Sequence, residues 1–141
     1  MRTGREVSVF VHRRGAVLPL KRARDGIWHI PAGGVEEGET PRDAAGRELE
    51  EETGLQAAAQ LQDLKCSQRD PFGDHAHGNY PPGVSRITLE NLAVEAPAGW
   101  EPRLDAEHTE YQWRSFDDAH ALFQWDNTRS AFQVLQDKLG R

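Results

Sequence analysis

The chain of 141 residues contains a single cysteine, Cys66, and no long run of apolar residues. One cysteine cannot form an internal disulfide bond, which fits a protein of a reducing compartment. A transmembrane helix needs about 20 consecutive apolar residues, and none are present. The first residues lead directly into the apolar run Val7–Val11 without a recognisable signal peptide. We therefore expect a cytoplasmic protein with no membrane partner.

The negative charge of the protein is concentrated in one segment. The net charge is -6, and residues 36–52 hold eight acidic residues against two arginines, so the rest of the chain is balanced. Such a segment repels the phosphate backbone of nucleic acids. We expect no nucleic-acid partner, and a phosphate-bearing ligand would need a bound cation to approach this segment.

The length corresponds to one domain, residues 1–141, and 37% hydrophobic residues suffice for a single core. Residues 7–11 and 16–20 predict two strands of a hairpin that turns at residues 13–15. Residues 27–34 predict a strand that ends in a tight loop, because a proline and two glycines exclude a regular helix. The N-terminal part of the chain is therefore expected to be β structure.

A helix is predicted over residues 41–53. Thr40 is a good N-cap, Pro41 suits the first helical position, and Asp43 stands at the capping-box offset. Gly54 follows as a C-terminal stop. This helix carries most of the acidic segment.

The remaining strands are predicted by apolar and β-branched residues. Residues 56–66 and 84–95 predict two strands, and Tyr111–Phe116 predicts the last. Residues 68–83 are rich in glycine, proline and histidine and predict the longest loop, which we expect to close over a substrate.

Two helices are predicted near the C-terminus. Asp117 is expected to cap a short one, and Asn127 or Thr128 is expected to cap the last. One face of the last helix is expected to be apolar, with Ala131, Val134, Leu135 and Leu139. Trp28 and Trp113 are expected in the core.

Three glutamates share one side of the predicted helix 41–53. Glu48 and Glu52 are one turn apart, and Glu51 is on the adjacent flank. Like charges at this spacing repel, and acidic groups near a helix C-terminus oppose the helix dipole. A charge run is most often a solvated surface, but a cluster of carboxylates also suits Mg²⁺ or Mn²⁺.

The surroundings of these glutamates favour the metal site. From Gly33 to Leu55 the chain matches every fixed position of a 23-residue pattern, the Nudix box, which includes Glu39, Arg47 and Gly54 as well as the three glutamates. The sequence therefore resembles the Nudix hydrolases. The approach to the box, residues 28–33, resembles that family as well.

The resemblance implies an α+β fold in which a mixed β-sheet lies between helices. It implies hydrolysis of a nucleoside diphosphate linked to another group, with Mg²⁺ or Mn²⁺ as cofactor. Glu48, Glu51 and Glu52 would bind the metal, and Glu51 or Glu52 would help to activate water. Arg47 would pair with a carboxylate and hold the helix, while Gly33 and Gly54 would allow the backbone turns.

Later segments resemble the members of the family that hydrolyse nucleoside or pterin triphosphates; these segments are residues 80–90, 107–113 and 125–129. This resemblance implies that Glu107 is a further metal ligand or catalytic carboxylate, and that Arg86 contacts phosphate or substrate. Ala32 and Gly33 would border the substrate, with Ala32 replacing a hydroxyl residue of those enzymes.

Other side chains are candidates for substrate contact. Lys21, Arg22 and Arg24 follow a predicted strand and are candidates to hold phosphates. Tyr80 is a candidate to stack on a ring, and Trp125 is a candidate to border the ring pocket. Residues 74–77 contain two histidines that could bind a metal, although a loop that touches substrate or solvent explains them as well.

The sequence thus predicts a metal-dependent pyrophosphohydrolase, a monomer or homodimer. The substrate would be a nucleoside triphosphate or dihydroneopterin triphosphate, cleaved between the α and β phosphates to a monophosphate and pyrophosphate. One alternative is a hydrolase of ADP-ribose or dinucleoside polyphosphates, because the box is common to all of them. The other is a non-catalytic Nudix module that senses nucleotides.

Overall fold

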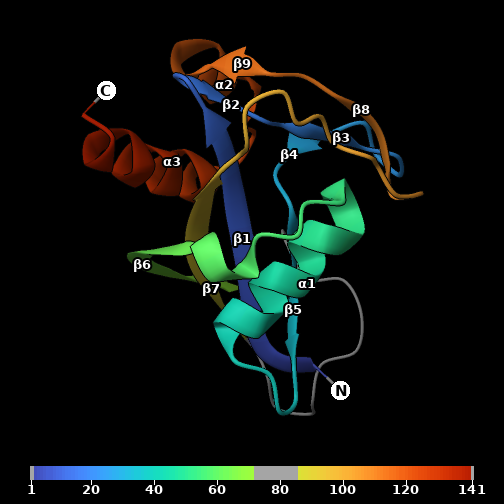
Figure 1. Ribbon diagram of the computed structural model, residues 1–141. Coiled ribbons are helices and arrows are strands. Elements are labelled where there is room, and N and C mark those ends of the chain that lie inside the picture. The colour runs from blue at the N-terminus through green and yellow to red at the C-terminus, as the bar shows by residue number, and fades with distance from the viewer. Residues whose placement is uncertain (1, 72–85, 141) are drawn as a thin grey trace.

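A mixed β-sheet forms the centre of the protein (Figure 1). The computed structural model describes residues 2–71 and 86–140. The strand order is β6-β7-β1-β2-β9, and β5 also pairs with β1. β1 and β7 run parallel, and the other pairs are antiparallel. The strands of this sheet are β1 (Arg2–Arg13), β2 (Ala16–Val17), β5 (Ala32–Glu36), β6 (Gln62–Pro71), β7 (Arg86–Glu95) and β9 (Arg114–Ser115).

A second, smaller sheet has the order β4-β3-β8. Its strands are β4 (Trp28–His29), β3 (Leu20–Arg22) and β8 (His108–Tyr111). Arg22 pairs with His108, and the amide of Ala23 donates to the carbonyl oxygen of Glu107 over 2.8 Å. Residues that are far apart in the sequence therefore meet at one place.

Helices cover both faces of the central sheet. They are α1 (Pro41–Thr53), α2 (Phe116–Leu122) and α3 (Asp126–Lys138), with a short 3-10 turn, η1 (Ala58–Gln60). Val7, Val9 and Val11 of β1 pack in one core cluster with Leu49 of α1. Phe10 packs in the other cluster and stacks on Phe132 of α3, with ring centroids 5.5 Å apart. This strand alternation produces the predicted arrangement of a sheet between helices, with α1 and α3 on opposite sides of β1 (Figure 1).

The helix α1 is confirmed with its predicted bounds. The Thr40 side chain accepts from the amide of Asp43, and the Asp43 carboxylate accepts from the amide of Thr40. Gly54 ends the helix at φ 80°, a left-handed conformation that favours glycine, and its amide donates to Glu50. Local capping signals fix both ends of the helix that carries the glutamates.

The predictions for the N-terminal strands need correction. The hairpin of β1 and β2 is confirmed, but residues 16–20 form two strands, because Pro19 separates β2 in the central sheet from β3 in the second sheet. Residues 27–34 do not form one strand that ends at the glycines. Pro31 separates β4 from β5, and β5 continues through Gly33 and Gly34 as far as Glu36.

The middle of the chain also differs from the prediction. Residues 56–61 contain η1, so β6 begins at Gln62, and it continues to Pro71 into the predicted loop. β7 begins at Arg86, and residues 84 and 85 lie outside the described residues. The same holds for residues 72–83, so closure of this loop remains a prediction.

The C-terminal predictions were wrong in detail. Residues 111–116 are not one strand: β8 ends at Tyr111, β9 is Arg114–Ser115, and Phe116 already belongs to α2. Ser115, and not Asp117, is the N-cap of α2, and its hydroxyl accepts from the amide of Asp118. The N-cap of α3 is Trp125, where Asn127 or Thr128 was predicted.

Some predicted core residues lie nearer the surface. Trp28 and Trp113 are only half-buried; Trp113 packs against the core cluster that contains Leu49, and its indole N–H donates to Glu101 over 2.9 Å. Leu139 is 36% exposed beyond the end of α3, whereas Ala131 and Leu135 are buried and Val134 packs beside them. None of the helices in the described ranges is both long and apolar enough to span a bilayer.

Candidate functional site

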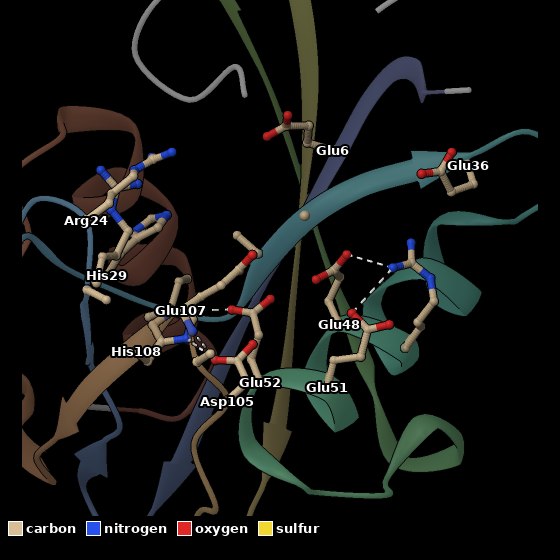
Figure 2. A pocket seen from close by; sticks show the side chains of 17 residues that line it. Glu6, Arg24, His29, Glu36, Glu48, Glu51, Glu52, Asp105, Glu107 and His108 are labelled. Atoms are coloured by element: carbon tan, nitrogen blue, oxygen red, sulfur yellow. Dashed lines mark hydrogen bonds and ion pairs between the residues drawn. The ribbon is translucent and has the colours of Figure 1, made fainter. Parts of the chain in front are cut away.

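A cavity of about 900 Å³ opens between α1, β5 and the segment that leads into β8 (Figure 2). Most of its polar lining is acidic. The carboxylates come from β1, β5, α1 and the segment before β8; they are Glu6, Glu36, Glu48, Glu51, Glu52, Asp105 and Glu107. Such a surface requires cations to balance it.

The three glutamates of α1 differ in their exposure to solvent. The side chain of Glu51 is 57% exposed, that of Glu48 is 12% exposed, and that of Glu52 is 4% exposed. Burial, and then the neighbouring carboxylate of Glu48, raises the pKa of Glu52 far above its usual range. Partial burial and the charge of Glu48 raise the pKa of Glu51 too. The cluster is thus electrostatically unfavourable by itself.

The arginine of the box holds the cluster in place. The guanidinium of Arg47 donates two hydrogen bonds of 2.9 Å to the two carboxylate oxygens of Glu39. It also donates to Glu48 Oε1 over 2.7 Å and to the carbonyl oxygen of Gly34 over 2.9 Å. Arg47 therefore connects α1 to β5 and to the loop before the helix, as the resemblance implied.

Gly33 allows β5 to approach this helix. A Cβ atom at residue 33 would lie 2.2 Å from Oε1 and Cδ of Glu48. No such contact is tolerated between a real Cβ and a carboxylate, so the glutamate occupies space that only glycine leaves open.

A second group of side chains, from the segment that leads into β8, approaches Glu52. The imidazole of His108 lies with Nδ1 2.8 Å from Asp105 Oδ1 and Nε2 3.5 Å from Glu52 Oε1 (Figure 2). Glu107, which lies between Asp105 and His108 in sequence, also lines the cavity. The pairing of β8 with β3 brings this segment to the cavity.

The residues fit a divalent cation. Oε2 of Glu52 is buried and has no hydrogen-bond partner among the described residues, which is costly for a carboxylate oxygen unless a cation satisfies it. Within the same residues, no three carboxylate, imidazole or thiol groups already form an assembled metal site. Like charges repel, and Glu48 instead binds Arg47, so assembly requires rotation of these side chains.

Apart from Arg47 and His108, the basic side chains lie on another part of the lining. Arg22, Arg24 and His29 line the cavity, and Arg24 and His29 lie away from Glu48 and Glu51 (Figure 2). The guanidinium of Arg22 binds Asp25 with bonds of 2.5 and 3.1 Å, and it lies 4.9 Å from the ring centroid of Trp125. His29 meets Trp125 edge-on, with ring centroids 5.1 Å apart. The pKa of Asp25 is lowered to about 2, chiefly by the hydrogen bond that it accepts from Arg22.

The cavity contains most of the residues predicted from the sequence, namely Arg22, Arg24, Ala32, Gly33, Arg47, Glu48, Glu51, Glu52 and Glu107. Lys21 is not brought to it, since strand alternation turns its side chain to Glu110, with Nζ 3.1 Å from Oε2. The predicted contacts of Tyr80 and of the Arg86 side chain lie outside the described residues, and so do residues 74–77.

Five titratable residues of the lining were not predicted from the sequence: Glu6, His29, Glu36, Asp105 and His108. Asp105 and His108 flank Glu107, and this short motif of titratable residues was the signal that could have found them. Glu6 and Glu36 carried no such signal, because only the pairing of β1 with β5 brings them to the cavity.

Comparison with known proteins identifies the class. The profile of the NUDIX domain matches residues 2–135. The chain therefore belongs to the Nudix family, and it is a Nudix hydrolase. Members of this family generally use a divalent metal such as Mg²⁺ or Mn²⁺ and act on small-molecule nucleotide substrates.

Individual relatives are similar over most of the chain. The dihydroneopterin triphosphate diphosphatase of Escherichia coli K12 is 33% identical over 134 residues, which cover 92% of this chain and 89% of that protein. The structure of the E. coli dihydroneopterin triphosphate pyrophosphohydrolase matches with a TM-score of 0.81 and 29% identity over 94% of each chain. An RNA pyrophosphohydrolase of Psychrobacter arcticus is 34% identical over 117 residues, 77% of this chain and 67% of the relative.

One relative is much longer than this chain. An octanoyltransferase of Myxococcus xanthus is 37% identical over 99 residues, which are 69% of this chain and 26% of that protein. The chain thus spans about a quarter of its length.

Proposed function

We propose that this Nudix hydrolase is a Mg²⁺- or Mn²⁺-dependent pyrophosphohydrolase of a nucleoside triphosphate or of dihydroneopterin triphosphate. The bond cleaved is the anhydride between the α and β phosphates, and the products are a monophosphate and pyrophosphate. The observation that carries the proposal is the division of one cavity into a carboxylate cluster around Glu52 and a separate group of basic side chains around Arg24.

The carboxylate cluster would hold the metal. Glu48, Glu51, Glu52 and Glu107 are the proposed ligands, because their oxygens suit a hard divalent cation and Glu52 has a buried oxygen without a partner among the described residues. A bound divalent cation would neutralise phosphate oxygens and lower the pKa of a bound water molecule.

The chain itself would orient the reactants. Arg47 holds α1 to β5 and to the loop before the helix through its bonds to Glu39 and Gly34, so the helix that carries the ligands keeps a fixed position. Glu51 or Glu52 would accept a proton from the attacking water. Arg22 and Arg24 would bind phosphate oxygens by charge-assisted hydrogen bonds. No covalent intermediate with the protein is required.

The relatives support the triphosphate class. A sequence relative and a structural neighbour, both from E. coli, are named for dihydroneopterin triphosphate, and each match covers about nine tenths of both chains or more. Trp125 borders His29 and Arg22 of the cavity, as expected for an aromatic side chain near a ring pocket.

A hydrolysis screen with Mg²⁺ tests the proposal. The panel contains dihydroneopterin triphosphate, the deoxynucleoside triphosphates, ADP-ribose, diadenosine polyphosphates and a short RNA with a 5′-triphosphate, with products separated by chromatography. We expect pyrophosphate release from one of the mononucleotide or pterin triphosphates. Selective cleavage of ADP-ribose, a dinucleotide or RNA would overturn the substrate class while leaving the metal site in place.

Two variants control for contaminating activity. Glu52→Gln should lower the rate by orders of magnitude with the fold intact, and retained activity would refute the assignment of Glu52 as a ligand. Glu107→Gln tests the carboxylate before β8. A loss of less than about threefold there would contradict its role, since even the loss of a residue that only supports a metal ligand typically costs 10-fold or more.

A further inference from the structure

Asp105, His108 and Glu52 form a line of three polar side chains across the junction between α1 and β8. The carboxylate of Asp105 lies 2.8 Å from Nδ1 of His108, and Nε2 of the same ring lies 3.5 Å from Oε1 of Glu52 (Figure 2). The side chains of His108 and Glu52 are 6% and 4% exposed. The imidazole is therefore a buried bridge between a half-buried carboxylate and the most buried glutamate of the cluster.

The backbone around this line is held at several points. Arg22 of β3 pairs with His108, and the amide of Ala23 donates to the carbonyl oxygen of Glu107. The amide of Arg103 donates over 2.8 Å to the carbonyl oxygen of Thr53, next to Glu52. The two ends of the line therefore belong to segments that are fixed to one another.

Asp105 determines the orientation of the imidazole. Its Oδ1 atom accepts from the His108 ring and also from the amide of Glu107, over 3.3 Å. With Nδ1–H donating to this carboxylate, the ring plane is fixed and Nε2 points to Glu52. In metal sites, partners of the ligands hold the ligands in orientation and raise metal affinity.

We propose that His108, held by Asp105, is a positioning residue that sets the orientation of the Glu52 carboxylate for metal binding. Neither residue is a ligand itself: His108 acts through Glu52, and Asp105 acts through His108. The inference rests on the proposed metal-dependent function, and it adds a supporting pair that the Nudix box does not contain.

Mn²⁺ binding to the substrate-free protein tests this role, with free Mn²⁺ measured by electron paramagnetic resonance. We expect His108→Leu to weaken binding by roughly 10- to 100-fold. Asp105→Ala should weaken it less, and the double variant should bind no more weakly than His108→Leu, because both substitutions interrupt one line. His108→Gln keeps a polar group that can donate or accept a hydrogen bond and should keep affinity within about threefold of wild type.

His120→Leu is the matched control. This imidazole of α2 is half-buried, contacts the ring of Phe132 and bonds to Gln136, away from the cavity. It should lower the melting temperature without changing Mn²⁺ affinity. If His108→Leu does not fold, Asp105→Ala carries the same test against the wild type.

Three results would overturn the inference. Unchanged Mn²⁺ affinity in His108→Leu, or equal weakening in His108→Gln and His108→Leu, would show that the imidazole only fills space. A double variant weaker than either single variant would make Asp105 an independent ligand. Failure of the wild type itself to bind Mn²⁺ would overturn the proposed metal-dependent function as well, so the two failures are distinguishable.

Discussion

Glu48 of α1 lies against the backbone of Gly33 in β5 so closely that a Cβ at residue 33 would fall 2.2 Å from the glutamate Oε1. The backbone conformation at this residue does not itself require glycine, because no positive φ occurs there. The requirement comes from the functional side chain. Glycine is therefore needed here to place a proposed metal ligand rather than to stabilise a turn.

Gly33→Ala should consequently impair activity more than stability. The new methyl group displaces the flexible end of Glu48, so we expect at least a tenfold loss of kcat with a small change in melting temperature. In a Glu48→Gln background the same substitution should add little, because the two changes affect one side chain. Additive losses in this cycle would show that Gly33 acts independently of Glu48.

Glu52→Gln should make the metal-free protein more stable than the wild type, by a margin that grows as the pH rises. The pKa of Glu52 is raised from its usual 4.5 in the folded state, so the unfolded chain releases this proton first, and increasing pH above that value destabilises the fold. Glutamine removes this penalty. In the presence of EDTA, the melting temperature of the variant should exceed that of the wild type by a margin that grows from about pH 5 to about pH 8. A constant or shrinking margin would contradict the raised pKa.

Arg47→Lys should weaken both the fold and the reaction. Lysine keeps the charge but cannot bond to Glu39, Glu48 and the Gly34 carbonyl at once. We expect a loss of about 1–3 kcal/mol in the free energy of unfolding by urea, together with a lower kcat. Arg103→Lys, at an exposed position, is the control and should change neither. Wild-type stability in Arg47→Lys would mean that the several hydrogen bonds of the guanidinium are not required.

Arg24→Gln and Lys21→Gln should differ in their effect on substrate binding. Arg24 lines the cavity, whereas Lys21 binds Glu110 outside its lining. We expect Arg24→Gln to raise KM for the triphosphate by about tenfold, as for one lost charge-assisted hydrogen bond. Lys21→Gln should leave KM nearly unchanged. Steady-state kinetics on the best substrate of the screen measures both, and a larger effect at Lys21 would contradict this division of roles.

The sequence predicts the parts of the site that depend on local chemistry. Thr40 and Asp43 specify the start of α1, and Gly54 specifies its end. The position of the helix and its three glutamates therefore follows from residues at or next to its two ends. The ion pair of Arg47 with a carboxylate follows from the resemblance to the Nudix family, and the structure shows that Arg47 pairs with both Glu39 and Glu48.

The remaining parts depend on pairings between distant segments. Pro19 and Pro31 each divide a predicted strand between two sheets, and nothing local shows to which sheet each half belongs. His108 reaches Glu52 only because β8 pairs with β3, which lies more than 80 residues earlier. Lys21 and Arg22 are adjacent in sequence, but strand alternation sends only Arg22 to the cavity.

The most direct test of the central claim is a ³¹P nuclear magnetic resonance measurement of the products formed from the preferred triphosphate with Mg²⁺ and with EDTA. We expect equal amounts of monophosphate and pyrophosphate with Mg²⁺, and no turnover with EDTA. Orthophosphate with a diphosphate product, or undiminished turnover in EDTA, would contradict it.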